Sequence, residues 1–98
     1  MFARISIATF QNGAMDEALD IFQRRMLPSA SMQNGFRGAF VSRDSQKNCA
    51  TIITMWETEA DMLASGPPLE IVKDVERFGA LIAEVTQEHQ EVILQIIK

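Results

Sequence analysis

One stretch constrains the fold of this chain more than any other: residues 35–61, with the sequence GFRGAFVSRDSQKNCATIITMWETEAD. Two runs rich in apolar and β-branched residues, 36–43 and 49–57, flank the polar segment 44–48, and this pattern predicts a β-hairpin. Successive side chains of a strand point to opposite faces of the sheet. Because both faces of the second run carry apolar residues, the hairpin needs an apolar cover on each side.

The segments on either side of the hairpin predict two further strands and two longer helices. Residues 2–10 alternate loosely and are rich in β-branched and aromatic types, which favours a strand. Residues 14–27 place apolar side chains at helical spacing, and residues 68–85 do the same. Residues 89–97 predict the last strand, with aliphatic side chains on both faces.

A few residues mark where these elements begin and end. Pro28 is expected to kink or end the first helix, because proline lacks the N–H and clashes with the preceding turn, and residues 29–33 could add another turn. Asn34 and Gly35 suit a left-handed helix stop. Thr58, followed three residues later by Asp61, is a capping signature and predicts a short helix after the hairpin.

The predicted order is therefore strand, helix, strand, strand, helix, strand. This is the split βαβ arrangement of ferredoxin-like domains, an α+β fold with an antiparallel sheet. A chain of 98 residues without internal repeats or a linker is expected to form one domain, residues 1–98.

Two helices can cover only one face of a four-stranded sheet. In a monomer the aliphatic residues of the other face would form a patch larger than soluble monomers usually tolerate. Burying a few hundred Å² of apolar surface per subunit is worth several kcal/mol, at roughly 25 cal/mol per Å². The sequence thus predicts a homodimer that pairs through one sheet face, since a twofold dimer is the commonest assembly.

Composition and charge argue against several classes of function. A net charge of −4 argues against nucleic acid as the partner. The single cysteine, Cys49, cannot form an internal disulfide, and the Cys/His spacing of a zinc site is missing, so we expect no metal. We find no signal peptide and no apolar run long enough to span a bilayer, and we expect a cytoplasmic protein that does not enter membranes.

A family resemblance rests on the strand GFRGAF, the polar hairpin and the segment MWETEADM, followed by a proline-interrupted helix and an apolar last strand. These features resemble the antibiotic biosynthesis monooxygenase domain, a family of the dimeric α+β barrel superfamily. The resemblance covers nearly the whole chain and implies that fold and a dimer. Some members are cofactor-independent oxygenases of polycyclic aromatic phenols, whereas others degrade haem.

The residues favour the first of these activities over the second. Haem-degrading members use an Asn on the first strand, a Trp in the short helix and a His soon after it. This chain has no Asn before Asn12, has Leu63 in the short helix, and lacks the His. Like the phenol oxygenases, it has a tryptophan at the end of the third strand, Trp56. The amide that those enzymes carry earlier on that strand face is replaced here by Ile52 and Thr54, and the chain has no tyrosine.

By this resemblance, the candidate substrate-binding residues lie between sheet and helices; they are Trp56, Thr54, Ile52 and Phe22. Trp56 would stack on a flat substrate, or else would simply anchor the core. Phe22 lies on the apolar stripe of the first helix, which is also typical of plain core packing.

The candidate catalytic residues are His89 and Arg4. His89 is the only imidazole in the chain, and histidine is the residue type that ordinarily titrates near neutral pH, so it could take a phenolic proton; the alternative is a solvated residue. Arg4 lies on the first strand on the same face as Phe2 and Ser6. If that face lines a pocket, Arg4 needs a partner or an anionic ligand, because an unpaired buried charge is costly.

Two functions remain open at this point. The first is a cofactor-independent monooxygenase that acts on an apolar aromatic molecule of the phenol or quinol type, with no bound cofactor. The second is a non-catalytic dimeric module that binds a small apolar ligand or has a purely structural role.

Overall fold

The computed structural model describes residues 1–98 and contains one antiparallel sheet of four strands. The strands are β1 (Phe2–Phe10), β2 (Phe36–Asp44), β3 (Cys49–Trp56) and β4 (Ile82–Glu91). Their order across the sheet is β2-β3-β1-β4, so the first strand lies in the middle and pairs with both β3 and β4. This arrangement confirms the predicted α+β, ferredoxin-like fold.

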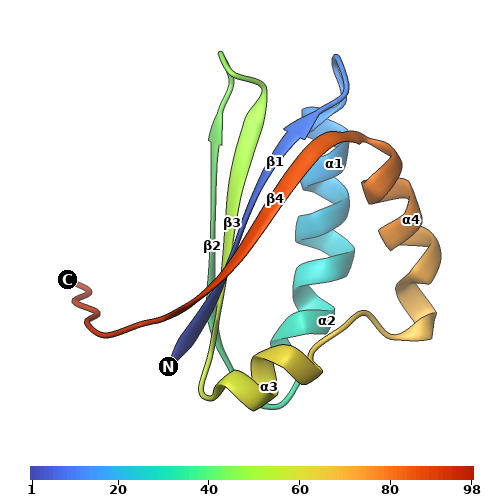
Figure 1. Cartoon of the computed structure of the whole chain (residues 1–98). Coiled ribbons are helices and arrows are strands. Elements are labelled where there is room, and N and C mark those ends of the chain that lie inside the picture. Colours follow the sequence, from blue (N-terminus) through green and yellow to red (C-terminus); the bar gives the residue numbers. More distant parts are fainter.

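The helical segments form a second layer. They are α1 (Met15–Ile21), the π-helical segment η1 (Phe22–Met26), α2 (Leu27–Ser31), α3 (Glu59–Ala64), the 3-10 turn η2 (Leu69–Ile71) and α4 (Val72–Ala80). Figure 1 shows α1, α2 and α4 on the same face of the sheet, with α3 at one end of it. No helix is both long and apolar enough to cross a membrane.

The first helical stretch runs further than predicted. It is continuous from Met15 to Ser31, and Pro28 lies in the first turn of α2, directly after η1. At the end of η1 the N–H of Leu27 donates to the carbonyl of Phe22, one residue further back than in an α-helix. This wider turn changes the carbonyl spacing ahead of Pro28, and we infer that it lets the helix continue past the proline ring.

The last helix is shorter than the predicted span of 68–85, because α4 ends at Ala80. Ile82 and Val85 fit the apolar stripe of a helix, but they belong to β4 and pair with β1. A β-bulge in β4 between these two residues puts both on the helix-facing side of the sheet. Because of the bulge, the apolar residues of this strand follow helical spacing, and for this reason the predicted helix extends too far.

The predicted last strand over 89–97 is also displaced towards the N-terminus. In the antiparallel pairing Glu91 lies opposite Phe2, where β1 begins. Beyond it, the N–H of Val92 still donates to the carbonyl of Met1 at 2.8 Å, but residues 92–98 form no strand. Four apolar side chains of this tail are exposed by 76% or more; they are Ile93, Leu94, Ile96 and Ile97.

The second strand departs from strict alternation. Phe36 pairs with Trp56 and Gly38 pairs with Met55, so Arg37 is the extra residue of a β-bulge. The bulge leaves Phe36 on the helix-facing side, where its ring packs edge-on against Trp56 with centroids 5.4 Å apart.

One predicted boundary signal is confirmed and one is displaced. Gly35 has the predicted left-handed conformation, with φ = +80°, but it lies in a turn beyond the helix, because α2 already ends at Ser31. Thr58 caps α3, because its Oγ1 accepts a hydrogen bond from the N–H of Asp61 at 3.0 Å.

The core lies between the helices and the sheet and is small, since only 13 of the 98 residues are buried. Its members are all apolar; they include Ala8, Phe10, Ala18, Phe22, Ala50, Ile52, Phe78 and Leu81. A core of this size leaves a short chain with little stability to spare.

No helix covers the opposite side of the sheet, which we call the outer face. Its central side chains are apolar; they are Ile5, Ile7, Phe40, Ile53 and Met55. Phe40 is 63% exposed and Ile7 is 46% exposed. The central strands are therefore apolar on this face, as the sequence predicted. The prediction is wrong for the last strand, because β4 presents Thr86, Glu88 and Gln90 there and the aliphatic residues assigned to it lie in the tail.

Candidate functional site

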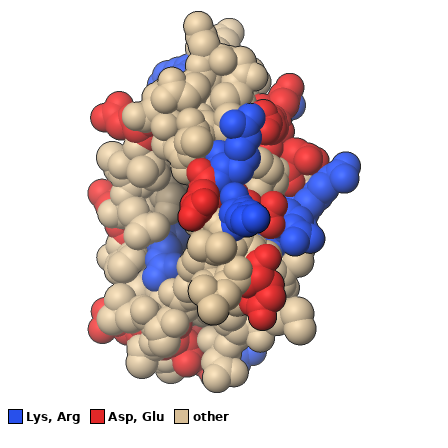
Figure 2. Space-filling view, turned by 90° about the vertical axis from the view of Figure 1, so that its right-hand side faces the viewer, with Lys and Arg blue, Asp and Glu red and all other residues tan.

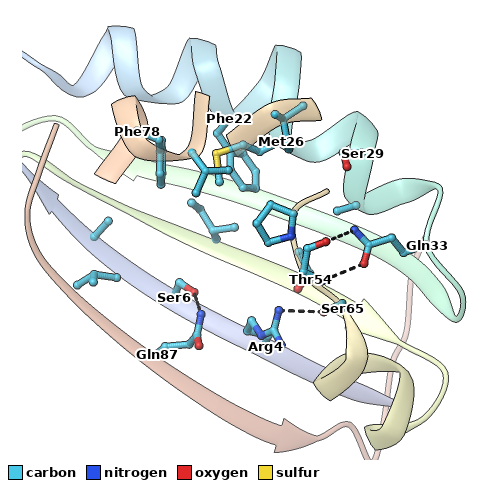
Figure 3. A pocket seen from close by; sticks show the side chains of 18 of the residues that line it. Arg4, Ser6, Phe22, Met26, Ser29, Gln33, Thr54, Ser65, Phe78 and Gln87 are labelled. Atoms are coloured by element: carbon cyan, nitrogen blue, oxygen red, sulfur yellow. Dashed lines mark hydrogen bonds between the residues drawn. The ribbon is translucent and has the colours of Figure 1, made fainter. Parts of the chain in front are cut away.

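A cavity of about 360 Å³ lies between the helical layer and the helix-facing side of the sheet. Figure 3 shows Phe22, Met26 and Phe78 of the helical layer on one side of it, and Arg4, Ser6 and Thr54 of the sheet on the other. It reaches the strand β4, where the lining residue Val85 is 53% exposed. This volume is within the usual range of small-molecule sites.

The helical wall of the cavity is apolar and aromatic. The rings of Phe22 and Phe78 pack against each other with centroids 5.9 Å apart and an interplanar angle of 39°. Met26 lies one turn after Phe22, so the π-helical segment supplies two neighbouring side chains to the cavity. Such segments are often found at functional sites, and this one provides a surface suited to a flat apolar ligand.

Trp56 belongs to both the core and the cavity. It lines the cavity, yet it is only 1% exposed. Its Nε1–H donates to Oγ1 of Thr54 at 3.0 Å, and this bond together with the contact to Phe36 fixes the indole. A hydroxyl can accept and donate at once, so Thr54 keeps its own O–H for a ligand.

Arg4 reaches the cavity from β1 and is partly buried. Its Nη1 donates to Oγ of Ser65 at 3.0 Å, and its Nη2 donates to the carbonyl of Met62 at 2.7 Å. Oγ of Ser65 also donates to that carbonyl, at 2.6 Å. The carbonyl lies near the C-terminal end of α3, the end of a helix that favours a cation. These contacts hold the guanidinium in place.

His89 lies directly opposite Arg4 on the neighbouring strand β4. The Nε–H of Arg4 donates to Nε2 of His89 at 3.4 Å, so this bond requires an imidazole whose Nε2 carries no proton. His89 is exposed and does not line the cavity. It touches the site through Arg4 and faces water on its other side.

Polar contacts close two borders of the cavity. Nε2 of Gln87 donates to Oγ of Ser6 at 3.2 Å, which links β4 to β1. At the opposite border the amide of Gln33 makes two bonds to Gly66: its Nε2 donates to the carbonyl at 2.8 Å, and its Oε1 accepts from the N–H at 3.1 Å. These two hydrogen bonds connect the loop after α3 to the segment that follows α2.

The structure brings the predicted site residues close together. Five of them line the cavity, and they are Arg4, Phe22, Ile52, Thr54 and Trp56. The sixth, His89, contacts Arg4 from outside the cavity.

Five polar lining residues are not among the predicted site residues; they are Ser6, Ser29, Gln33, Ser65 and Gln87. Gln87 falls between the predicted helix over 68–85 and the predicted strand over 89–97, so the sequence does not place it on the strand that lines the cavity. Gln33 and Ser65 carry no signal in the sequence, since their contacts depend on how the loop after α3 packs against α2 and β1.

The electrostatics of the cavity differ from those of the surface. Arg4 is the only charged residue among the 20 that line the cavity. On the helix-covered side of the molecule, acidic and basic side chains are interspersed (Figure 2). Arg77 pairs there with Glu17, and Arg25 with Asp74. No group of three or more His, Cys, Asp or Glu residues lies together as a metal site would require.

Solved structures with the same fold come from several bacteria. SnoaB from Streptomyces nogalater, a cofactor-independent oxygenase solved in mutant form, superposes with a TM-score of 0.79 at 17% identity, covering 99% of this chain and 97% of that chain. A candidate antibiotic biosynthesis monooxygenase from Deinococcus radiodurans also gives 0.79, at 13% identity, over 100% of this chain and 98% of that chain. A third, from Nitrosomonas europaea, gives 0.81 at 10% identity, over 96% of this chain and 100% of that chain.

These likenesses establish the fold. No curated protein matches the chain in sequence. The family model described as antibiotic biosynthesis monooxygenase, however, matches residues 1–65, about two thirds of the chain. That match includes β1, the β2–β3 hairpin with Trp56, and α3. The chain therefore belongs to the antibiotic biosynthesis monooxygenase family.

Proposed function

We propose that this protein is a cofactor-independent monooxygenase of a small apolar aromatic molecule of the phenol or quinol type. The observation that carries the proposal is the cavity itself, which joins an aromatic wall to a single cationic group, Arg4. Membership of the family and the fold shared with a cofactor-independent oxygenase support it.

The chemistry needs no external electron donor. A phenol with a free ring C–H reacts with O₂ to give a quinone and water. One oxygen atom replaces the ring hydrogen, and the second leaves as water with that hydrogen and the phenolic proton. The electron-rich ring supplies all the electrons, so the protein has to bind the phenol, favour its anion and exclude bulk water.

The residues have distinct roles in this proposal. Trp56 and Phe22 position the ring, and the O–H of Thr54 orients a polar substituent. The guanidinium of Arg4 stabilises the phenolate, since a positive group next to an oxyanion lowers the energy of the charged form. In this proposal the phenolic proton first passes to water, and the exposed His89 takes it from there as its Nε2 releases the Nε–H of Arg4.

Oxygen uptake tests the proposal. Purified protein is mixed with a panel of phenols and hydroquinones, and O₂ consumption is recorded together with quinone absorbance. We expect turnover with at least one bicyclic or tricyclic phenol, and a kcat/KM about tenfold lower or worse in Arg4→Gln, because a charge-assisted contact is lost. Arg24→Gln, which removes an exposed arginine paired with Asp20, serves as the control and should leave turnover unchanged. Binding of the panel without any O₂ consumption would contradict the proposal.

A second candidate is a non-catalytic module that binds a small apolar ligand. One observation favours it: β3 supplies mostly apolar side chains to the cavity, and the polar groups present are largely hydrogen-bonded to one another. In that case Trp56→Ala would weaken ligand binding while no turnover would be there to lose.

We further propose that two copies pair through the outer face. Its apolar side chains and the exposed apolar tail beyond β4 are large unpartnered surfaces, and burying them would add to the small core of each subunit. We propose a twofold dimer, because a twofold axis lets the same face of both copies cover each other.

A further inference from the structure

Arg4 stands apart from every other arginine of the chain. The others each form an ion pair with a carboxylate: Arg24 with Asp20, Arg25 with Asp74, Arg37 with Glu57, Arg43 with Asp16 and Arg77 with Glu17. No Asp or Glu pairs with Arg4, and none lines the cavity that it enters. The protein has a net charge of −4, yet Arg4, its least exposed arginine, has no acidic partner.

The partners that Arg4 does have are neutral. They are Oγ of Ser65, the carbonyl of Met62 and, for an imidazole with a free Nε2, that atom of His89. These bonds use one N–H on each of the three guanidinium nitrogens. A guanidinium has five N–H groups, so one remains on Nη1 and one on Nη2. The side chain is thus held in position with two donors uncommitted.

Partial burial of a cation without a counter-anion costs free energy, and a bound anion would offset that cost. Oγ of Ser65 and the carbonyl of Met62 lie 2.6 Å apart, so they occupy the parallel N–H pair of Nη1 and Nη2. The two remaining N–H groups point to opposite sides of the guanidinium, and either one can give a charge-assisted hydrogen bond to an oxyanion. The rest of the cavity suits a flat apolar body, because Phe22 and Phe78 form one wall and Ile52 with Trp56 forms part of the other. The cavity therefore offers one charged end and one aromatic end.

We propose that the ligand of this cavity is an aromatic oxyanion, a carboxylate or a phenolate, whose charged group binds Arg4 and whose ring lies between Phe22 and the sheet. The proposal specifies the class of substrate that the oxygenase site binds. It rests on the proposed function only in so far as the bound anion is taken to be a substrate. The binding preference itself is independent of turnover.

Matched ligands of one shape and different charge test the inference by calorimetry. The first pair is 2-naphthoate against the neutral 2-naphthamide at neutral pH. The second pair is 4-nitrophenolate, above the pH of its ionisation, against the neutral 4-nitroanisole. We expect the anion of at least one pair to bind about tenfold tighter or more, as one charge-assisted hydrogen bond implies. The pair that shows the preference identifies carboxylate or phenolate as the preferred group.

Variants assign the preference to Arg4. Arg4→Gln should bind the two members of a pair equally, Arg4→Lys should keep part of the preference, and Arg24→Gln should keep all of it. Equal binding of both members by the native protein, or a preference that survives in a folded Arg4→Gln, would overturn the inference. If Arg4→Gln does not fold, the comparison of ligands on the native protein still decides. Absent O₂ consumption would defeat the proposed function and leave this preference intact.

Discussion

At the scale of single residues, Trp56 connects stability to the site. It is the largest fully buried side chain of the chain, and it also borders the cavity. The edge-on contact with Phe36 and the bond to Thr54 fix one orientation of the ring. A ligand that enters the cavity therefore meets a wall that is already in place, which lowers the cost of binding.

We expect Trp56→Ala to lower the free energy of unfolding by about 3–5 kcal/mol, because it removes a large buried ring and leaves a void. Trp56→Phe should cost clearly less, since it keeps an aromatic ring beside Phe36. Urea unfolding followed by circular dichroism measures both, independently of tryptophan fluorescence. A loss below about 1 kcal/mol in Trp56→Ala would show that the ring is not anchored as described.

The sequence singles out individual residues where the chemistry of the residue type is restrictive. Trp56 and Arg4 stood out because a lone tryptophan and a charge on an apolar strand each need a special environment. Ser65 and Gln33 did not stand out, because serine and glutamine are ordinary surface residues. Only the packing of the loop after α3 gives them a role.

At the scale of elements, the loop after α3 is held at the cavity by two side chains, Arg4, which bonds Ser65, and Gln33, which bonds Gly66. The double hydrogen bond between Gln33 and Gly66 resembles the pairing of two strands and joins segments that are 33 residues apart. Pro67, the next residue, lines the cavity, so the position of this loop shapes the border of the site.

Gln33→Ala should release this loop. We expect the amide of Gly66 to exchange its hydrogen faster, because its acceptor is lost, and stability to fall by about 1 kcal/mol. Hydrogen exchange followed by NMR or mass spectrometry measures the change at residues 65 and 66. Gln23→Ala, an exposed glutamine of η1 without such a bond, is the control and should leave that amide unchanged. An unchanged Gly66 amide in Gln33→Ala would contradict the described contact.

The order of elements followed from the sequence, but several of their boundaries did not. The hairpin and its flanking cap were predictable because local signals, such as the side chain of Thr58, act within three residues. The start of β4 was not, because the bulge that puts Ile82 and Val85 on one face is fixed by pairing with β1, a strand more than 70 residues away. Local periodicity cannot distinguish such a bulged strand from a helix.

At the scale of the whole molecule, the main feature is a sheet with helices on one face only (Figure 1). Phe40, Ile53 and Ile5 lie next to one another across β2, β3 and β1 on the uncovered side. The sequence indicated the apolar outer face of the central strands, because apolar residues occupy both alternating positions of β1 and β3, whereas the outer positions of β4 are polar.

We expect the native protein to sediment as a dimer at micromolar concentration. Phe40→Lys should shift it towards the 11.0 kDa monomer, because the new charge would be buried against the partner. Leu63→Lys provides the matched control: Leu63 is 60% exposed, but it lies on α3, away from the outer face, and the variant should remain dimeric. Analytical ultracentrifugation distinguishes these outcomes, and a native protein that sediments as a folded monomer would contradict the pairing.

The central claim is that the cavity between sheet and helices is the functional site and that Arg4 is its point of charge recognition. A crystal structure of the protein with 2-naphthoate tests this most directly. We predict that the rings lie between Phe22 and the sheet, bordered by Trp56, with a carboxylate oxygen within hydrogen-bond distance of Nη1 or Nη2 of Arg4. A ligand bound on the outer face, or in the cavity with its carboxylate turned away from Arg4, would contradict the account.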